Sequence, residues 1–354
     1  MPECAASNDY DGRMGTRISS IFVILVASTF GAMFPVLARR SRHKFVPDWV
    51  FFVAKYFGSG VIIATAFIHL LAPANEALTN ECLTGVIAAY PWPEGIALMT
   101  IFLMHFLELM TMRYANFGGD HQHDASHTHA AIPAAASNSS SIEETKGHDI
   151  EAAGPGNPNI RGDDHLGHQR QHNAEGEYGS ELEPRHLVPS DYAAQLTAVF
   201  ILEFGVIFHS IFIGLTLAVA GSEFITLYIV LVFHQMFEGL GLGSRLAEVP
   251  WPASRRWTPY FLGLGYGLST PIAIAIGLGV RQSFAPESKT TLLSNGIFDS
   301  ISAGILIYTG LVELMAHEFM FSPYMQNGPV SRTLKAYALM TLGAGLMALL
   351  GYWA

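Results

Sequence analysis

Eight long apolar stretches recur along the chain, separated by short polar links and by one long polar segment. A helix needs about 20 mainly apolar residues to cross the hydrocarbon core of a bilayer, and the stretches are of that order. We therefore predict an all-α polytopic membrane protein with eight transmembrane helices. The stretches are residues 18–37, 49–71, 94–112, 193–220, 224–242, 260–280, 293–315 and 334–352.

A polar segment, residues 115–192, interrupts this pattern after the third stretch. It is rich in Gly, Ser, Asn, Pro, acidic residues and His and has no apolar periodicity, which is typical of disorder. The predicted chain has a tail at 1–17, three helices in 18–114, this His-rich loop, and five helices in 193–354.

Basic residues indicate which helix ends face the cytosol. A cluster at 39–44 follows the first stretch, whereas a secretory signal peptide carries its basic residues before the apolar core. The loop between the second and third stretches contains no Lys or Arg, although Arg281 and Lys289 lie in the loop after the sixth. By the positive-inside rule we predict that both termini lie outside and that the His-rich loop lies in the cytosol.

The composition agrees with a lipid environment, because half of the residues are hydrophobic and only 14% are charged. The net charge of −10 gives no reason to expect a nucleic-acid partner. Both cysteines, Cys4 and Cys82, fall outside on this topology. An oxidising exterior permits a disulfide between them, and two unpaired thiols are the alternative.

Two polar clusters interrupt neighbouring apolar stretches, His209-Ser210 in the fourth and His234-Gln235-Met236-Phe237-Glu238 in the fifth. Ionisable groups at that depth are costly in lipid, and are usually functional. His234 and Glu238 share one helical face, and the short link at 221–223 makes the two helices antiparallel. Two imidazoles and a carboxylate suit zinc, with Ser210, Gln235 or water as further ligands. An interhelical hydrogen-bond network is the alternative.

Glycines near both clusters predict that the fourth and fifth helices approach each other closely, since small residues allow close helix packing in membranes. They are Gly205, Gly214, Gly239, Gly241 and Gly243.

Polar residues in the second and third stretches are further candidates. His69 is expected to line the pathway or orient a ligand, with a structural histidine as the alternative. Glu76 follows in an outward loop, where it either collects cations or is simply solvated. His105 and Glu108 lie three residues apart, which favours bonding between helices over a place in the pathway.

The seventh stretch also carries polar residues. Asp299 near its outer end is interpreted either as an entrance residue or as a helix cap. Glu313 lies deeper, and His317 and Glu318 lie at the inner end, where a cytosolic exit and a hydrated helix end are equally favoured.

Four histidines cluster at the start of the long loop: His121, His123, His127 and His129. Two His-x-His pairs can wrap a zinc ion without a prebuilt fold, so we predict weak, exchangeable metal binding there. A solvated low-complexity linker is the alternative.

Four segments together resemble the ZIP family of zinc and iron permeases, with a pattern most like the plasma-membrane zinc transporters of fungi and plants. The resemblance covers nearly the whole membrane part and the His-rich loop. The segments are GVIIATAFIHLL (60–71), HSIFIGLTLAV (209–219), HQMFEGLGLGSRL (234–246) and FDSISAGILIYTGLVELMAHEF (298–319).

The resemblance implies a transporter rather than an enzyme, which imports zinc into the cytosol as its substrate and needs no cofactor. It implies a transport site at His209, His234 and Glu238, and an adjoining site at Ser210, Gln235 and again Glu238. It also implies that helices one, four, five and six slide against the other four, commonly in a homodimer. The plasma membrane is the expected location and an organelle membrane the alternative.

Two departures from the family pattern refine these expectations. Ile213 stands where some members have a metal-bridging Glu, which favours one principal metal. The segment 72–74 lacks the acidic residue of many iron transporters, which favours zinc over iron.

Other functions stay open beside zinc import. One is broad transport of iron, manganese or cadmium, and another is a membrane metal sensor that does not transport. A membrane metalloenzyme is disfavoured, since His317 and Glu318 could begin an H-E-x-x-H motif but Phe321 stands in place of its second histidine.

Overall fold

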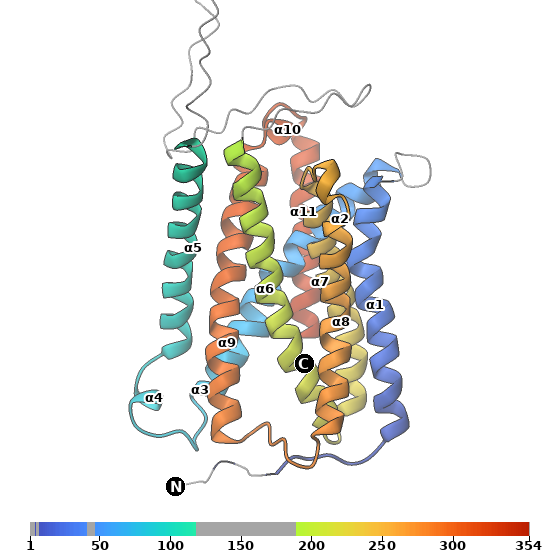
Figure 1. Cartoon of the computed structure of the whole chain (residues 1–354), viewed down its shortest axis with the longest axis vertical. Coiled ribbons are helices and arrows are strands. Elements are labelled where there is room, and N and C mark those ends of the chain that lie inside the picture. The colour runs from blue at the N-terminus through green and yellow to red at the C-terminus, as the bar shows by residue number, and fades with distance from the viewer. Residues whose placement is uncertain (1–3, 5–6, 41–46, 118–188, 354) are drawn as a thin grey trace, which may run out of the picture.

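The computed structural model describes residues 4, 7–40, 47–117 and 189–353, and long helices aligned with its long axis dominate it (Figure 1). The regular structure in these ranges is entirely helical. Eight helical spans are long and apolar enough to cross a membrane, which confirms the predicted all-helical fold. The helices that form the spans are α1 (Met14–Arg40), α2 (Asp48–Ala64) with η1 (Thr65–Leu71) and α3 (Ala72–Leu78), α5 (Trp92–Phe117), α6 (Pro189–Val219), α7 (Phe224–Glu248), α8 (Thr258–Gly279), α9 (Lys289–Tyr308) with η3 (Thr309–Phe321), and α11 (Val330–Leu350).

Three short helices lie between the spans: α4 (Val86–Ala89), η2 (Ala253–Arg255) and α10 (Pro323–Gln326). The N-terminal segment and α4 lie at one end of the bundle, and α10 lies at the opposite end (Figure 1). We call these the N-terminal end and the α10 end.

The second and seventh spans are longer than predicted, at Asp48–Leu78 and Lys289–Phe321. Each contains a π-helical segment, η1 or η3. The apolar stretches end earlier than the helices because the last turns carry polar residues, among them Glu76 in α3 and Glu318 in η3. Short π-helical segments occur frequently at functional sites, and His69 lies in η1.

Most of the extensive helix contacts fall into two groups. α1 packs along α7 and α8, and α6 packs along α8. In the second group α2 packs along α11, and α9 packs along α5, η1 and α3, while α2 also packs along α7 and so joins the two groups. The groups are therefore spans one, four, five and six, and spans two, three, seven and eight. This is the division on which the expected sliding motion rests.

The expectation that glycines bring α6 against α7 is wrong. Gly243 faces the backbone of Ala32 in α1, and Gly241 faces Gly58 in α2. Gly214 faces the backbone of α8, and Gly205 faces side chains of α9. The short link makes α6 and α7 antiparallel, but their small residues lie on the faces turned towards other helices.

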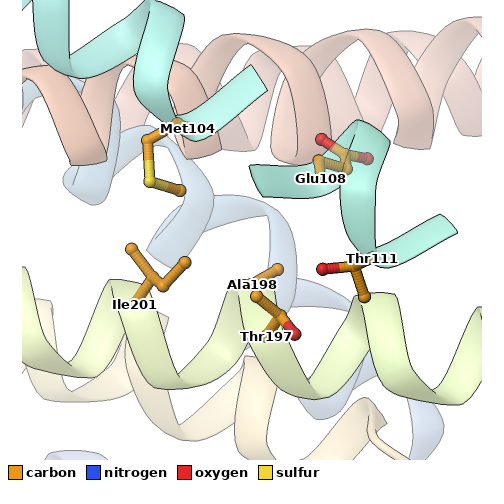
Figure 2. Close-up of a pocket in the computed structure, with 6 residues that line it drawn as sticks. All are labelled: Met104, Glu108, Thr111, Thr197, Ala198 and Ile201. Carbon is orange, nitrogen blue, oxygen red and sulfur yellow. The ribbon is translucent and has the colours of Figure 1, made fainter. Parts of the chain in front are cut away.

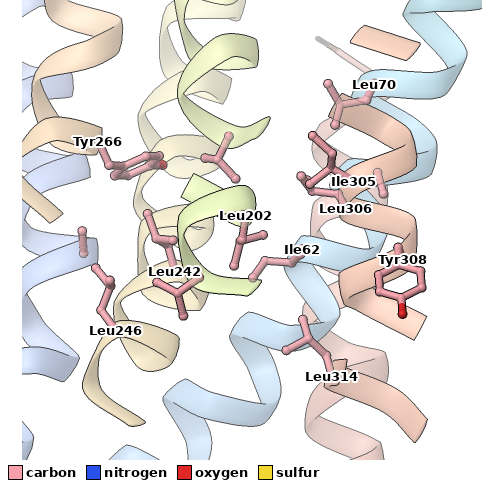
Figure 3. Close-up of a cluster of buried hydrophobic side chains, with 14 of the residues drawn as sticks. Ile62, Leu70, Leu202, Leu242, Leu246, Tyr266, Ile305, Leu306, Tyr308 and Leu314 are labelled. Atoms are coloured by element: carbon pink, nitrogen blue, oxygen red, sulfur yellow. The ribbon is translucent and has the colours of Figure 1, made fainter. Parts of the chain in front are cut away.

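A hydrophobic cluster packs the two groups together (Figure 3). Leu242 and Leu246 of α7 belong to the same buried set as Ile62 of α2 and Leu306 of α9. Packing of this kind holds membrane helices together without a hydrophobic driving force from water.

Two links organise the N-terminal end. Cys4 and Cys82 form a disulfide with Cα atoms 5.0 Å apart, which ties the N-terminal tail to the segment between the second and third spans. Arg17 is fully buried and donates hydrogen bonds to the carbonyl oxygens of Leu217, Ala218 and Ala220 at the end of α6. These carbonyls have no partner within the helix, so Arg17 caps α6 and fixes its position.

Candidate metal centre

The two polar clusters predicted from the sequence meet between α6 and α7. The ring centroids of His209 and His234 lie 5.9 Å apart, and both rings are buried. Gln235 Nε2 donates to Ser210 Oγ over 3.4 Å. Glu238 is one turn along α7, with its Oε2 atom 3.7 Å from His234 Nε2. The five residues therefore form one continuous buried polar set.

His69 joins this set from the other helix group. Its ring meets the His234 ring edge to face, with centroids 4.6 Å apart. Its Nε2 atom lies 3.0 Å from the carbonyl oxygen of Met347 in α11, which fixes the ring's orientation. His69 therefore packs against the candidate ligand His234 and is itself held by the backbone of α11.

Asp299 also joins the centre from the other group. The carboxylate lies on α9, with Oδ1 3.4 Å from His209 Nδ1. The alternative of a helix cap is wrong, because Ser288 caps α9 by accepting a hydrogen bond from the Thr291 amide. A carboxylate that accepts from one nitrogen of an imidazole leaves the other nitrogen's lone pair free for a metal. Asp299 is thus placed to present His209 Nε2 as a ligand.

Four buried polar atoms of the centre have no hydrogen-bond partner among the described residues. They are His209 Nε2, His234 Nε2, Gln235 Oε1 and Glu238 Oε1. Buried polar groups in folded proteins are nearly always bonded, so four such atoms at one place require an explanation. Imidazole nitrogens and carboxylate oxygens are ligand atoms that zinc prefers.

These candidate ligand atoms lie near one another, but they do not surround a common position for a metal ion. In this conformation no three His, Cys, Asp or Glu side chains within the described ranges are placed to hold a metal ion together. The types of ligand atom fit zinc. To bind the ion, these side chains would have to move closer to one another.

Tyr266 of α8 belongs to the centre, although the sequence analysis did not identify it. Its hydroxyl is fully buried and lies 2.7 Å from the backbone oxygen of Gln235 and 3.3 Å from Glu238 Oε2. By holding Oε2 it leaves Glu238 Oε1 as the unpartnered oxygen. The available signal was one of two tyrosines, with Tyr260, in a largely apolar and glycine-rich stretch, which does not reveal the face of α8 that Tyr266 occupies.

His105 and Glu108 lie away from this centre, between α5 and α9. The Tyr308 hydroxyl lies 2.5 Å from Glu108 Oε2 and 3.4 Å from His105 Nδ1. These contacts support the favoured interpretation of bonding between helices. Glu108 also lines a small pocket between α5 and α6 (Figure 2), together with Met104, Thr111, Thr197, Ala198 and Ile201.

Glu318 takes part in a network of ion pairs at the α10 end. Lys55 of α2 pairs with Glu318 of η3, at 2.8 Å, and with Glu248 of α7. Arg245 of α7 lies 3.3 Å from Glu248 and 3.6 Å from Glu318. The network, Lys55, Arg245, Glu248 and Glu318, joins the two helix groups at this end.

The remaining candidates are less buried than the residues of the centre. Glu76, predicted to lie in a loop, is exposed on helix α3. Glu313 and His317 are half-buried in η3, where the His317 ring lies 6.1 Å from that of Phe321. The four clustered histidines of the long loop lie outside the described residues: His121, His123, His127 and His129.

The comparison with protein families identifies the chain. The model of a family described as "ZIP Zinc transporter" matches residues 14–351. The chain belongs to the ZIP zinc transporter family. This confirms the resemblance seen in the sequence, and makes the protein a multi-pass membrane transporter rather than an enzyme.

Named relatives agree with this assignment. The ZIP chain is 43% identical to Zinc-regulated transporter 2 of Saccharomyces cerevisiae, over 99% of its own length and 97% of that protein. It is 44% identical to Zinc-regulated transporter 1 of the same organism, over 98% and 89%. It is 40% identical to Zinc-regulated transporter 1 of Schizosaccharomyces pombe, over 98% and 87%. Zinc is therefore the transported substrate to which family and relatives point.

Proposed function

We propose that this ZIP transporter imports zinc into the cytosol through a site formed by His209, His234 and Glu238. The observation that carries the proposal is the set of four unpartnered donor atoms buried between α6 and α7 within the described structure. Burying such atoms without partners is costly, and a zinc ion satisfies the imidazole nitrogens and the carboxylate oxygen at once.

The neighbouring residues have separate roles in this proposal. Asp299 and Tyr266 hold His209 and Glu238 so that their free atoms can reach the metal. Ser210 and Gln235, which bond each other, offer an adjoining position through the free Gln235 oxygen. One principal metal is therefore expected at His209, His234 and Glu238.

The position of the site between the two helix groups supports a mechanism of alternating access. His209, His234 and Glu238 lie on one group, whereas His69 and Asp299 contact them from the other. Sliding of one group along the other would separate Asp299 from His209 and loosen the hold on the ion. Binding must be strong enough to replace the hydration shell and weak enough to allow release.

The network of ion pairs at the α10 end supports the direction of transport. It joins α7 to α2 and η3, so in this conformation it holds the two groups together at that end. On the topology predicted from basic residues, the α10 end faces the cytosol. Import then requires these pairs to open after zinc has bound from the other side.

Location and loop function complete the proposal. The resemblance favours the plasma membrane, and the His-rich loop at 115–192 would bind arriving zinc weakly in the cytosol. Iron, manganese and cadmium are alternative cargoes that share the same donor preferences in part.

Uptake of radioactive zinc by cells that express the chain tests direction and site together. We expect saturable uptake that is lost in His234→Ala/Glu238→Ala and retained in His105→Ala/Glu108→Ala, a matched control at the α5–α9 contact. Competition by iron, manganese and cadmium defines the cargo. Equal uptake by all three proteins would overturn the assigned site.

A further inference from the structure

Glu203 is a buried carboxylate that the proposed mechanism does not use. It lies on α6 with 3% of its surface exposed. Within the described residues neither carboxylate oxygen has a hydrogen-bond partner, and no ion pair of Glu203 is found there. An acidic side chain inside a membrane bundle is expensive, and usually marks an ion or proton pathway.

Glu203 lies on the face of α6 that leads to the metal centre. Ser210 is seven residues further along, or about two turns, so both side chains point to the same side. Ser210 on that face accepts the hydrogen bond of Gln235. His209 is six residues from Glu203, which corresponds to roughly 9 Å along the helix axis.

The direction from His209 to Glu203 is the direction towards the α10 end. α7 runs antiparallel to α6, so its residues pass from His234 through Glu238 to Glu248 in the same sense. Glu248 belongs to the ion-pair network at that end. Glu203 therefore lies between the metal centre and the network.

Tyr266 packs in the hydrophobic cluster that surrounds Glu203, and its hydroxyl is bonded to Glu238 of the centre. The residues adjoining Glu203 on α6, Leu202 and Val206, belong to the hydrophobic cluster that packs the two groups (Figure 3 labels Leu202). In such surroundings a carboxylate is either protonated or balanced by a cation beside it.

We propose that Glu203 forms a second, weaker binding position for the transported divalent cation, which the ion occupies after leaving His209, His234 and Glu238 on its way to the α10 end. The inference rests on the proposed function. A single carboxylate, with water in the remaining positions, binds a divalent ion more weakly than two imidazoles and a carboxylate, which suits release.

Glu203→Gln tests this directly, because glutamine keeps the size of the side chain and mimics a neutral carboxylic acid. The measurements are equilibrium zinc binding to the purified full-length protein and zinc flux in liposomes. We expect the variant to bind one zinc equivalent fewer than the wild type, and to lose the weaker one. We expect its maximal flux to fall at least about tenfold, with little change in KM. Glu287→Gln, an exposed loop carboxylate, is the matched control and should behave as the wild type.

Two results would overturn the inference. Wild-type binding and flux in Glu203→Gln would show that the side chain acts only as a neutral group. Loss of the zinc equivalent at His209, His234 and Glu238 together with the one assigned to Glu203, with a lowered unfolding temperature, would show that Glu203 holds the structure. The His-rich loop contributes equally to every protein, so the comparison between variants is unaffected by it.

Two further measurements keep this inference separate from the proposed function. His234→Ala/Glu238→Ala should lose the tighter equivalent and keep the weaker one, whether or not the wild type carries zinc across a membrane. Absence of wild-type flux would count against the proposed function. The equilibrium binding measurement would still test whether Glu203 binds zinc. If Glu203→Gln does not fold, cadmium can be located by anomalous scattering in wild-type crystals. Density beside Glu203 is expected, and its absence at saturating cadmium would overturn the inference.

Discussion

Replacing Asp299 with Asn should weaken zinc binding without abolishing it. Asp299 Oδ1 lies 3.4 Å from His209 Nδ1, and both residues are buried. The substitution keeps the size of the side chain but removes the negative charge that favours a proton on Nδ1. His209 then loses part of its preference for the form in which Nε2 carries the free lone pair.

The magnitude follows from the kind of contact. Removing a group that orients a metal-bound histidine typically reduces metal affinity about 10- to 100-fold. This corresponds to about 1.4–2.7 kcal/mol, which lies close to the range of about 1.5–3 kcal/mol for a hydrogen bond to a charged group. The 3.4 Å separation is long for such a bond, which favours the lower part of the range.

The assay is zinc affinity of the purified protein together with the KM of zinc flux in liposomes. Asp48→Asn, at the exposed start of α2, is the control and should leave both unchanged. Wild-type affinity in Asp299→Asn would refute the orienting role. Complete loss of binding in a folded protein would also refute it, because Asp299 would then be a ligand itself.

Three further predictions concern Glu238, helix packing and pH. Tyr266→Phe removes the hydroxyl that holds Glu238 Oε2, so we expect zinc affinity to fall about 5- to 10-fold, in line with about 1 kcal/mol for one hydrogen bond, and unchanged binding would contradict this. Gly243→Ala places a methyl group against the backbone of Ala32, so the unfolding free energy should fall by about 1–3 kcal/mol, whereas Gly265→Ala, with open space around it, should unfold at the wild-type temperature. Zinc flux should fall once the pH is low enough to protonate the ligand histidines, because only the neutral imidazole binds metal, and flux that rises at mildly acidic pH would instead indicate proton coupling.

The helical spans could be predicted because lipid imposes a length and a composition on each of them. Their extent was harder to predict where the helix continues into a more polar sequence. α3 extends the second span beyond residue 71, and the last part of η3 extends the seventh beyond residue 315, although polar residues such as Glu76 and Glu318 interrupt the apolar run there.

The candidate ligands could be identified because polar residues in apolar stretches stand out. His234 and Glu238 are linked by spacing alone, and the short link brings His209 close to them. The contacts that residues on distant helices make with this centre could not be predicted in the same way. Asp299 and Tyr266 reach the centre only because α9 and α8 present particular faces to it, and sequence spacing within one helix does not fix that rotation.

The same limit explains why the glycine prediction failed. Gly243 was expected to face α6, and it faces α1. A glycine shows that some backbone approaches closely, whereas the identity of that backbone depends on how all the helices assemble. Glu203 carries the same signal as the ligands, an acidic residue in an apolar stretch, and that signal could have identified it as a candidate.

Zinc flux in liposomes that contain only the purified chain tests the central claim most directly. The wild type should carry zinc with saturation, and His234→Ala/Glu238→Ala should carry none while remaining folded. Equal flux through both proteins would contradict the assigned site. Zinc binding without flux in the wild type would contradict transport itself.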